Sequence, residues 1–228
     1  MDDRVTATEK TSTGPDDLLS RYRRTRAALV SDVLDGLGLR AQTIHPGISH
    51  RSGPAPLVGR AATLTVGAVD VVPQVPYITQ FEAVEMLEAG EVMVVAAPAV
   101  LAAFWGELIT TRVVARGCAG AVIDGYTRDL AAICDYDFPL WARGTHPADS
   151  AGRLEAVEIR KPIDCGGVTV ATGDIVVADS DGVAFVPAHL GAQVVELAEI
   201  KAVKEDEVRE ALRRGERVQD VFARIGVM

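Results

Sequence analysis

Two short, wholly apolar runs rich in β-branched residues constrain the fold of this chain most strongly. They cover residues Val92–Ala97 and Ala119–Ile123. Such runs are typical of strands that are buried on both faces of a sheet. The segment between them, Phe104–Arg116, has a helical composition and stops at Gly117, a residue type that commonly ends helices. The order strand, helix, strand predicts a right-handed crossover with two parallel strands.

An acid, an arginine and a second acid follow the ends of these two strands. Glu107 comes after the first strand, and Arg128 and Asp129 come after the second, with twenty residues between Glu107 and Arg128. The carboxyl ends of parallel strands meet at one edge of a sheet, and open α/β sheets bind their ligands there. An acid can hold a cation, and an arginine beside it can hold an anion. The group therefore predicts a site for a small carboxylate substrate and a divalent metal.

The rest of the chain predicts further elements by periodicity and turn residues. The expected helices are Asp16–Ala28, a short helix capped by Ser31 and ending near Gly36, Tyr77–Leu87, Asp129–Cys134, the amphipathic Ala188–Arg214 and Val218–Ile225. The expected strands are Arg60–Val66, Val157–Ile163 and a β-meander over Val168–Val186, with a loop at Thr43–Pro56. Together they predict an α/β fold, a three-layer β/β/α sandwich with a central βαβ unit and a C-terminal amphipathic helix.

The constellation at the sheet edge resembles a signature of the class II 4-hydroxy-4-methyl-2-oxoglutarate and 4-carboxy-4-hydroxy-2-oxoadipate aldolases. Those enzymes share their family with the regulator of ribonuclease E activity A. The signature is an acid, twenty residues and then Arg-Asp, which here is Glu107 and Arg128-Asp129. Similar blocks at Ser31–Gly38 and Gly166–Val183 extend the resemblance from about Ser31 to Pro187.

The chain departs from the family pattern in two places. Many aldolases of the family carry Asp where this chain has Glu107, whose carboxylate reaches one methylene further. Where the family has Gly-Asp-Asn, this chain reads Gly67–Pro73 and has no asparagine. The second departure leaves an aldolase or lyase for a different 2-keto acid as an open alternative.

The resemblance implies a role for each charged residue. Asp129 would ligate Mg²⁺ (or Mn²⁺) as one carboxylate among several waters, although the residues alone also allow an N-cap of the following helix. Arg128 would bind the substrate carboxylate with two N–H groups, the alternative being an ion pair with Asp124 or Asp129. Glu107 would orient a water that acts as the base, the alternative being a favourable place near the positive end of a helix.

Substrate contacts are also expected from the start of the helix after the first strand. Gly106, Leu108 and Ile109 lie there, and free backbone N–H groups at a helix start can hold anionic oxygens. The implied reaction is retro-aldol cleavage of a 4-hydroxy-2-keto acid to pyruvate, with oxaloacetate decarboxylation through the same enolate. No lysine lies near this constellation in the sequence, which disfavours a Schiff-base aldolase.

The resemblance also implies assembly. Family members form trimers or two stacked trimers with active sites between subunits, so a homotrimer or homohexamer is expected. An acid among Glu205, Asp206 and Glu207 would then reach a neighbouring site, although a solvated helix face is the plainer interpretation. The alternative function is a non-catalytic, ring-shaped regulator that binds ribonuclease E or another protein.

Composition favours a cytoplasmic protein that acts on small molecules. The chain of 228 residues has no Ser/Gly/Pro-rich linker, so residues 1–228 are expected to form a single α/β domain, with residues 1–14 disordered. The formal charge of −9 argues against nucleic acid as a partner, because phosphate binding needs clustered Lys and Arg. The longest apolar run, Val92–Trp105, is too short to span a bilayer, and the first residues do not resemble a signal peptide.

Overall fold

Strands and helices alternate through most of the described chain. The computed structural model describes residues 15–227. The strands are β1 (Ser49–Ser52), β2 (Leu57–Ala68), β3 (Glu91–Ala96), β4 (Ala103–Trp105), β5 (Gly120–Thr127), β6 (Leu140–Thr145), β7 (Leu154–Ile159), β8 (Ile163–Cys165), β9 (Val168–Val170), β10 (Ile175–Asp179) and β11 (Gly182–Val186). The helices are α1 (Pro15–Tyr22), α2 (Ala27–Gly36), α3 (Ile78–Glu85), α4 (Glu107–Ala115), α5 (Leu130–Asp135), the 3-10 turn η1 (Ala188–Leu190), α6 (Gly191–Arg213) and α7 (Val218–Ile225). The disorder expected for residues 1–14 falls outside the described residues.

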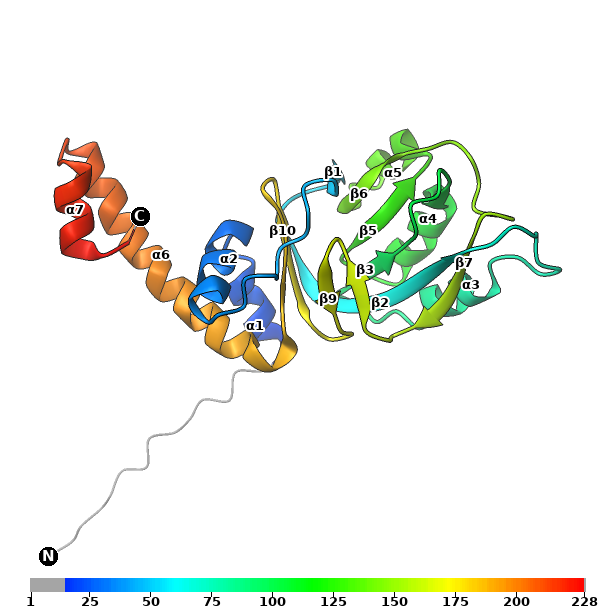
Figure 1. Cartoon of the computed structure of the whole chain (residues 1–228), viewed down its shortest axis with the longest axis horizontal. Helices are drawn as coiled ribbons and strands as arrows, with labels where there is room; N and C mark the ends of the chain where they lie inside the picture. The colour runs from blue at the N-terminus through cyan, green and yellow to red at the C-terminus, as the bar shows by residue number, and fades with distance from the viewer. Residues whose placement is uncertain (1–14, 228) are drawn as a thin grey trace, which may run out of the picture.

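Parallel strands form the centre of the main sheet (Figure 1). Its order is β1-β6-β5-β3-β2-β10-β11, with β4 paired to β5 and β7 paired to β2. The predicted crossover is confirmed, since β3 and β5 are parallel neighbours with Val94 opposite Val122, and α4 connects them. Gly117 follows α4 with φ +77°, the left-handed conformation that glycine adopts most readily after a helix.

The helix between the crossover strands is shorter than the sequence predicts. Residues Ala103–Trp105 form β4, which pairs in parallel with the end of β5, and α4 begins only at Glu107. Phe104 and Trp105 are almost completely buried. Their burial against the sheet outweighs the helical composition of this stretch, because tertiary packing overrides weak local preferences.

The predicted β/β/α layering is confirmed by the two faces of β3. Val92 and Val94 pack against the hairpin β8–β9. Met93 and Val95 lie on the opposite face of the sheet, which α3, α4 and α5 cover. Alternate residues of a strand point to opposite faces, so a strand covered on both sides has no polar position. This explains why the run is apolar throughout. Tight turns at Gly166-Gly167 and Ser180–Gly182 connect β8 to β9 and β10 to β11.

The N-terminal helices differ from the prediction. The expected helix over residues 16–28 is divided, because α1 ends at Tyr22 and α2 begins at Ala27. Ser31 lies inside α2 and does not cap it. Instead the backbone N–H of Ala27 donates to Oδ2 of Asp179, at the end of β10, at 2.8 Å. This acid is distant in the sequence, so no local signal marks the start of α2.

Several strands were not expected or were displaced. The predicted loop over residues 43–56 contains β1, which pairs with β6, and neither strand was predicted. Strand β7 begins at Leu154, three residues before the predicted start at Val157, and pairs with β2. Strand β2 itself extends beyond the predicted residues 60–66 at both ends. Strand β1 has only four residues, and the pairings of β1 with β6 and of β2 with β7 both contain register shifts. The partners of β1 and β7 lie far away in the sequence, so local patterns do not mark these strands.

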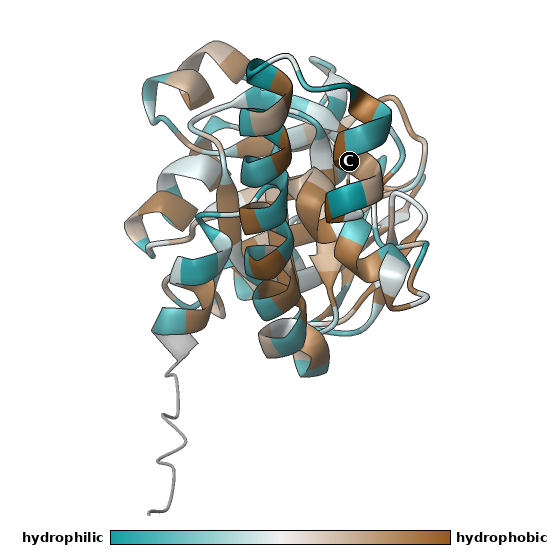
Figure 2. Cartoon of the chain, turned by 90° about the vertical axis from the view of Figure 1, so that its left-hand side faces the viewer, coloured by the Kyte–Doolittle hydropathy of each residue, from teal (hydrophilic) through white to brown (hydrophobic). Residues whose placement is uncertain are grey.

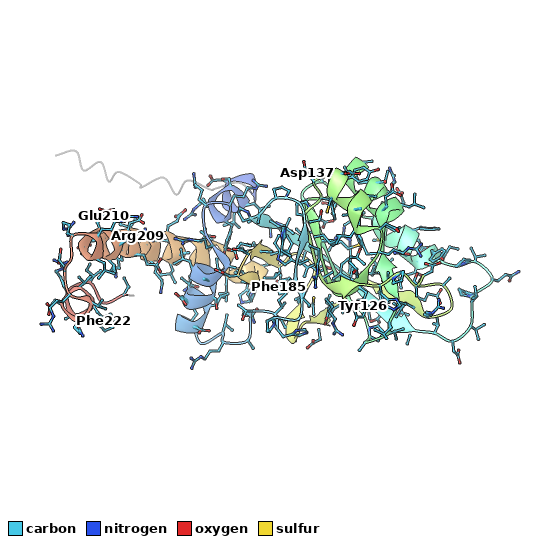
Figure 3. The ribbon with its side chains drawn as sticks, turned by 90° about the horizontal axis from the view of Figure 1, so that it is seen from above. Tyr126, Asp137, Phe185, Arg209, Glu210 and Phe222 are labelled. Atoms are coloured by element: carbon cyan, nitrogen blue, oxygen red, sulfur yellow. The ribbon has the colours of Figure 1, made fainter. Side chains whose placement is uncertain are left out.

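The C-terminal helices form an arm that extends away from the sheet (Figure 1). The amphipathic helix expected over residues 188–214 is confirmed, apart from the initial turn η1, and so is the final helix up to Gly226. The first half of α6 packs on β10, β11, α1 and α2, with Val194, Val195 and Ala198 buried. The second half meets α7 in a small separate cluster of Val208, Ala211 and Val221. Figure 3 shows Arg209, Glu210 and Phe222 at the far end of this arm, remote from Tyr126 and Asp137 in the body.

Among residues 15–227, no helix combines the length and the apolar character needed to span a membrane.

Candidate functional site

The site lies where β4 and β5 end side by side. Strand β5 ends at Thr127, and the backbone N–H of Arg128 donates to the carbonyl of Trp105, the last residue of β4, at 2.9 Å. The backbone N–H of Glu107 then donates to Oδ2 of Asp129 at 3.3 Å. The structure therefore brings the start of α4 next to Arg128 and Asp129, as the sequence spacing predicts.

Asp129 does not cap the helix that it precedes. It occupies the N-cap position of α5 in the left-handed conformation, with φ 56° and ψ 34°, and its side chain makes no capping hydrogen bond there. The carboxylate instead faces the first turn of α4. Left-handed backbone is uncommon for residues other than glycine, and such strain is concentrated at functional positions. The capping interpretation of Asp129 therefore has no support in the geometry.

Arg128 lies between two carboxylates. Its Nε is 3.6 Å from Oδ2 of Asp129, and its Nη1 is 3.3 Å from Oδ1 of Asp149. Asp124, the other partner considered from the sequence, is buried and pairs with Arg143. Arg128 is thus held at the site by acids on both sides, and its side chain stays about one third exposed.

Asp149 and Tyr77 are site residues that sequence reasoning missed. The Tyr77 hydroxyl donates to Oδ2 of Asp149 at 2.6 Å, and the backbone N–H of Ser150 donates to Oδ1 at 2.8 Å. Burial alone would raise the pKa of Asp149, but these two hydrogen bonds and the charge of Arg128 outweigh it and lower the pKa below its ordinary value. The hydrogen bond to Asp149 raises the pKa of Tyr77. The available signal was a polar segment after β6, at the same sheet edge, but β6 itself had not been predicted.

Glu107 contacts Asp129 through its backbone N–H, but its carboxylate binds other residues. Oε1 of Glu107 accepts hydrogen bonds from the Thr111 hydroxyl at 2.9 Å and from the Tyr136 hydroxyl at 3.3 Å. Thr111 lies on α4 and Tyr136 lies just after α5, and neither residue lines the cavity described below. The role of Glu107 in orienting a water stays a prediction.

A cavity of about 320 Å³ opens beside these residues. Its walls are formed by Tyr77, Gln80, Phe81, Ala103, Phe104, Trp105, Gly106, Leu108, Ile109, Arg128, Asp129, Asp149 and Ser150. The predicted contacts Gly106, Leu108 and Ile109 are all among them. The first N–H groups of a helix have no partner within it, so the start of α4 can donate hydrogen bonds into the cavity. No lysine of the described chain lines it.

Gly106 allows α4 and Asp129 to approach each other closely. A Cβ atom at Gly106 would lie 2.9 Å from Oδ2 of Asp129 and 3.3 Å from Cγ of Arg128. Its φ of −160° is accessible to any residue, so the requirement for glycine here is one of space.

The residues present fit a hard divalent cation bound mainly through water. No group of three or more His, Cys, Asp or Glu side chains converges within residues 15–227. The side chain of Asp129 is 47% exposed, and within the described part of the chain its carboxylate contacts one backbone N–H and Arg128. Mg²⁺ commonly keeps several waters and takes one or two carboxylates, and Mn²⁺ accepts the same oxygen ligands. Asp129 is therefore the residue that would hold such an ion.

Comparison with known proteins places this geometry in a family. Residues 27–185 match the RraA-like family, described as Aldolase/RraA. A protein of Halalkalibacterium halodurans, named "Putative 4-hydroxy-4-methyl-2-oxoglutarate aldolase", is 32% identical over 195 residues, which cover 85% of this chain and 87% of that protein.

Solved structures agree with the sequence match. The crystal structure of RraAS2 from Streptomyces coelicolor, described as an unusual member of the RNase ES inhibitor RraA protein family, has a TM-score of 0.78 and 27% identity. The alignment covers 85% of this chain and 97% of RraAS2. An uncharacterized protein from Pseudomonas syringae also has a TM-score of 0.78, with 28% identity over 90% of this chain and 96% of that one. The family match covers well over half of the sequence and includes the whole Gly106–Asp129 constellation, so the chain belongs to the RraA-like family.

Proposed function

We propose that this protein is a divalent-metal-dependent pyruvate aldolase. It would cleave a 4-hydroxy-2-keto acid to pyruvate by a retro-aldol reaction and decarboxylate oxaloacetate as a side activity. The observation that supports the proposal is the pair Arg128 and Asp129. The two residues lie side by side in the wall of a cavity, next to the first N–H groups of α4. The aldolase name of the relative from Halalkalibacterium halodurans supports the same reaction class.

Each residue has a definite task in this reaction. Arg128 binds the carboxylate of the substrate with two parallel N–H groups, which a planar guanidinium can do and an ammonium cannot. The N–H groups of Leu108 and Ile109 hold the oxygen on which negative charge develops as the C3–C4 bond breaks. Asp129 would hold a divalent cation, which when bound would supply Lewis-acid stabilisation of that charge and would lower the pKa of a coordinated water.

The C4 hydroxyl proton needs an acceptor. We assign this step to a water oriented by Glu107, whose backbone already contacts Asp129. Its carboxylate faces Thr111 and Tyr136 in the structure, so the assignment requires a side-chain rotation. Such rotations are fast for partly exposed side chains.

The proposal is tested by pyruvate release from oxaloacetate and from 4-hydroxy-4-methyl-2-oxoglutarate, with Mg²⁺ or Mn²⁺ and with EDTA. The variant is Asp129→Asn, because Asn keeps the shape of Asp and tolerates the left-handed backbone. We expect activity to require metal and to fall at least about 100-fold in the variant, as when one group that stabilises developing charge is removed.

A matched control is available at Asp137. This exposed acid also has left-handed backbone, with φ 49°, and does not line the cavity, so Asp137→Asn should leave the rates unchanged. Activity that survives EDTA, or that survives Asp129→Asn, would contradict a metal site at Asp129.

A second candidate function is regulation of a ribonuclease. Structural similarity to RraAS2, described as belonging to an RNase ES inhibitor family, favours it, as do the exposed apolar residues of the C-terminal arm. A non-catalytic binder has no use for the Arg128–Asp129 pair beside a cavity, so the aldolase is preferred. Inhibition of ribonuclease E by the wild type, with no metal-dependent pyruvate release, would support the regulator instead.

A further inference from the structure

Arg128 contacts its acids differently from three other arginines of this chain. Each of those three donates two hydrogen bonds of 2.6 to 2.9 Å to a single glutamate; they are Arg21, Arg112 and Arg160. In contrast, Nη1 of Arg128 lies 3.3 Å from Asp149 and Nε lies 3.6 Å from Asp129. The Arg128 side chain donates no hydrogen bond to any residue of the described chain, so its N–H groups stay available for a ligand in the cavity.

The Asp149 carboxylate is held by two donors other than Arg128. The Tyr77 hydroxyl donates to Oδ2 at 2.6 Å, and the backbone N–H of Ser150 donates to Oδ1 at 2.8 Å. The backbone beside Asp149 is fixed as well, since the N–H of Ala103 donates to the carbonyl of Ala148 at 2.9 Å. A carboxylate that keeps these two hydrogen bonds cannot turn both of its oxygens towards Arg128.

The fold fixes the position of Tyr77. This residue precedes α3 with left-handed backbone, φ 67°, a conformation that is uncommon for a bulky side chain and is concentrated at functional positions. Its ring lies 5.9 Å from that of Phe81, measured between centroids, and both residues line the cavity. The hydrogen bond to Asp149 raises the pKa of Tyr77, so the hydroxyl remains a donor near neutral pH.

We infer that Tyr77 is a positioning residue that prevents Asp149 from pairing fully with Arg128. The charge of Asp149 then keeps the guanidinium in the cavity wall, while the N–H groups of Arg128 remain free for the substrate carboxylate. The inference rests on the proposed function, because it concerns the arginine assigned to that carboxylate. Without the Tyr77 hydroxyl, the Asp149 carboxylate would rotate and accept two parallel hydrogen bonds from Arg128, the favoured geometry of such pairs.

The test is a double-mutant cycle on the full-length protein with Mg²⁺. The measured quantity is the Kd of pyruvate, obtained from the broadening of its methyl signal in NMR. Tyr77→Phe should raise this Kd by at least about tenfold, because the ligand loses hydrogen bonds from a charged group when Arg128 pairs with Asp149. In the Asp149→Asn background the same change should alter the Kd by less than about twofold, since a neutral amide with one acceptor oxygen cannot pair with Arg128 in this way.

Steady-state kinetics with oxaloacetate give a second measurement. Tyr77→Phe should raise KM and leave kcat nearly unchanged, because a contact to the substrate carboxylate that persists through the reaction stabilises the ground state and the transition state alike. A lower kcat with an unchanged KM would contradict a role in carboxylate binding.

Tyr126→Phe is the matched control, because it removes the hydroxyl of a tyrosine on the neighbouring β5 that does not line the cavity. Its Kd should equal that of the wild type. An equal rise of the Kd for Tyr77→Phe in both backgrounds would show that Tyr77 acts through packing and would overturn the inference. An unchanged Kd in Tyr77→Phe, or a wild type that does not bind pyruvate, would overturn it as well. If Asp149→Asn does not fold, Asp149→Ser provides the background without a carboxylate.

The outcomes separate this inference from the proposed function. Metal-dependent pyruvate release by the wild type, together with an unchanged Kd in Tyr77→Phe, would reject the inference and leave the aldolase standing. Absence of pyruvate release, together with an effect of Tyr77→Phe that needs Asp149, would reject the aldolase. Tyr77 would then remain a positioning residue of a site that binds 2-keto acids.

Discussion

At the scale of single residues, the site is a set of carboxylates held by neighbours that are remote in the sequence. Asp129 faces the start of α4, and Asp149 is held by Tyr77 from the segment before α3. The sequence placed Arg128 and Asp129 correctly at the end of a strand, because an apolar run followed by charge marks that edge. The sequence could not predict that Asp149 belongs to the site. Its position depends on the parallel pairing of β5 with β6, which no local pattern indicated.

The close approach at Gly106 can be tested by Gly106→Ala. The added Cβ would displace the carboxylate of Asp129, which is the flexible end of a side chain, so the free energy of unfolding should change by less than about 1 kcal/mol. Metal-dependent activity should fall by about 10- to 100-fold, as when the support of a metal ligand is disturbed. The control is Gly36→Ala, where a Cβ would meet nothing within 4 Å. An unchanged rate in Gly106→Ala would show that this contact does not matter.

At the scale of elements, interactions between distant segments decide where helices begin and how they dock. Asp179 receives the first N–H of α2, and Arg21 of α1 binds Glu199 of α6 through two hydrogen bonds of 2.9 and 2.6 Å. The hydrogen bond from Arg21 lowers the pKa of Glu199 below its ordinary value of 4.5. The helices were predictable from periodicity, but their partners were not.

The ion pair between α1 and α6 predicts a pH-dependent contribution to stability. Because the folded pKa of Glu199 is lowered, the contribution is fully present above the unfolded pKa and is lost as pH falls through the folded pKa. Glu199→Gln should therefore destabilise the protein by about 0.2–1 kcal/mol near pH 7 and by much less near pH 3. Urea unfolding at both pH values measures this, with Glu207→Gln, an exposed acid of the same helix, as the control. An equal effect at both pH values would refute the linkage.

At the scale of the whole molecule, the sandwich carries a helical arm with exposed apolar side chains. Val203 on α6 is 71% exposed and Phe222 on α7 is 51% exposed, and Leu197 and Ile200 line a groove beside α2. Figure 2 shows apolar segments among the polar ones along these helices. Neighbouring exposed apolar residues usually mark an interaction surface.

We expect this arm to take part in self-association. The wild type should have a molar mass in solution of three or six times 24.1 kDa, measured by light scattering after size exclusion. Val203→Asp should shift the distribution towards smaller species, since an interface loses stability when a charge is buried in it. Gln193→Asp adds the same charge at another exposed position of α6 and serves as the control. A monomeric wild type would contradict the expected trimer or hexamer.

The sequence by itself determined the central crossover, the layering and the Arg128–Asp129 constellation. These features follow from local sequence patterns. A strand that is covered on both faces must be apolar, so charged residues appear only after the strand ends. The tertiary structure alone decided the division of α1 from α2, the strand at Ala103–Trp105, the direction of the Glu107 carboxylate and the addition of Tyr77 and Asp149 to the site. Each of these depends on a hydrogen bond or on burial, and the residues that provide it are fixed by the fold and are not marked by local sequence pattern.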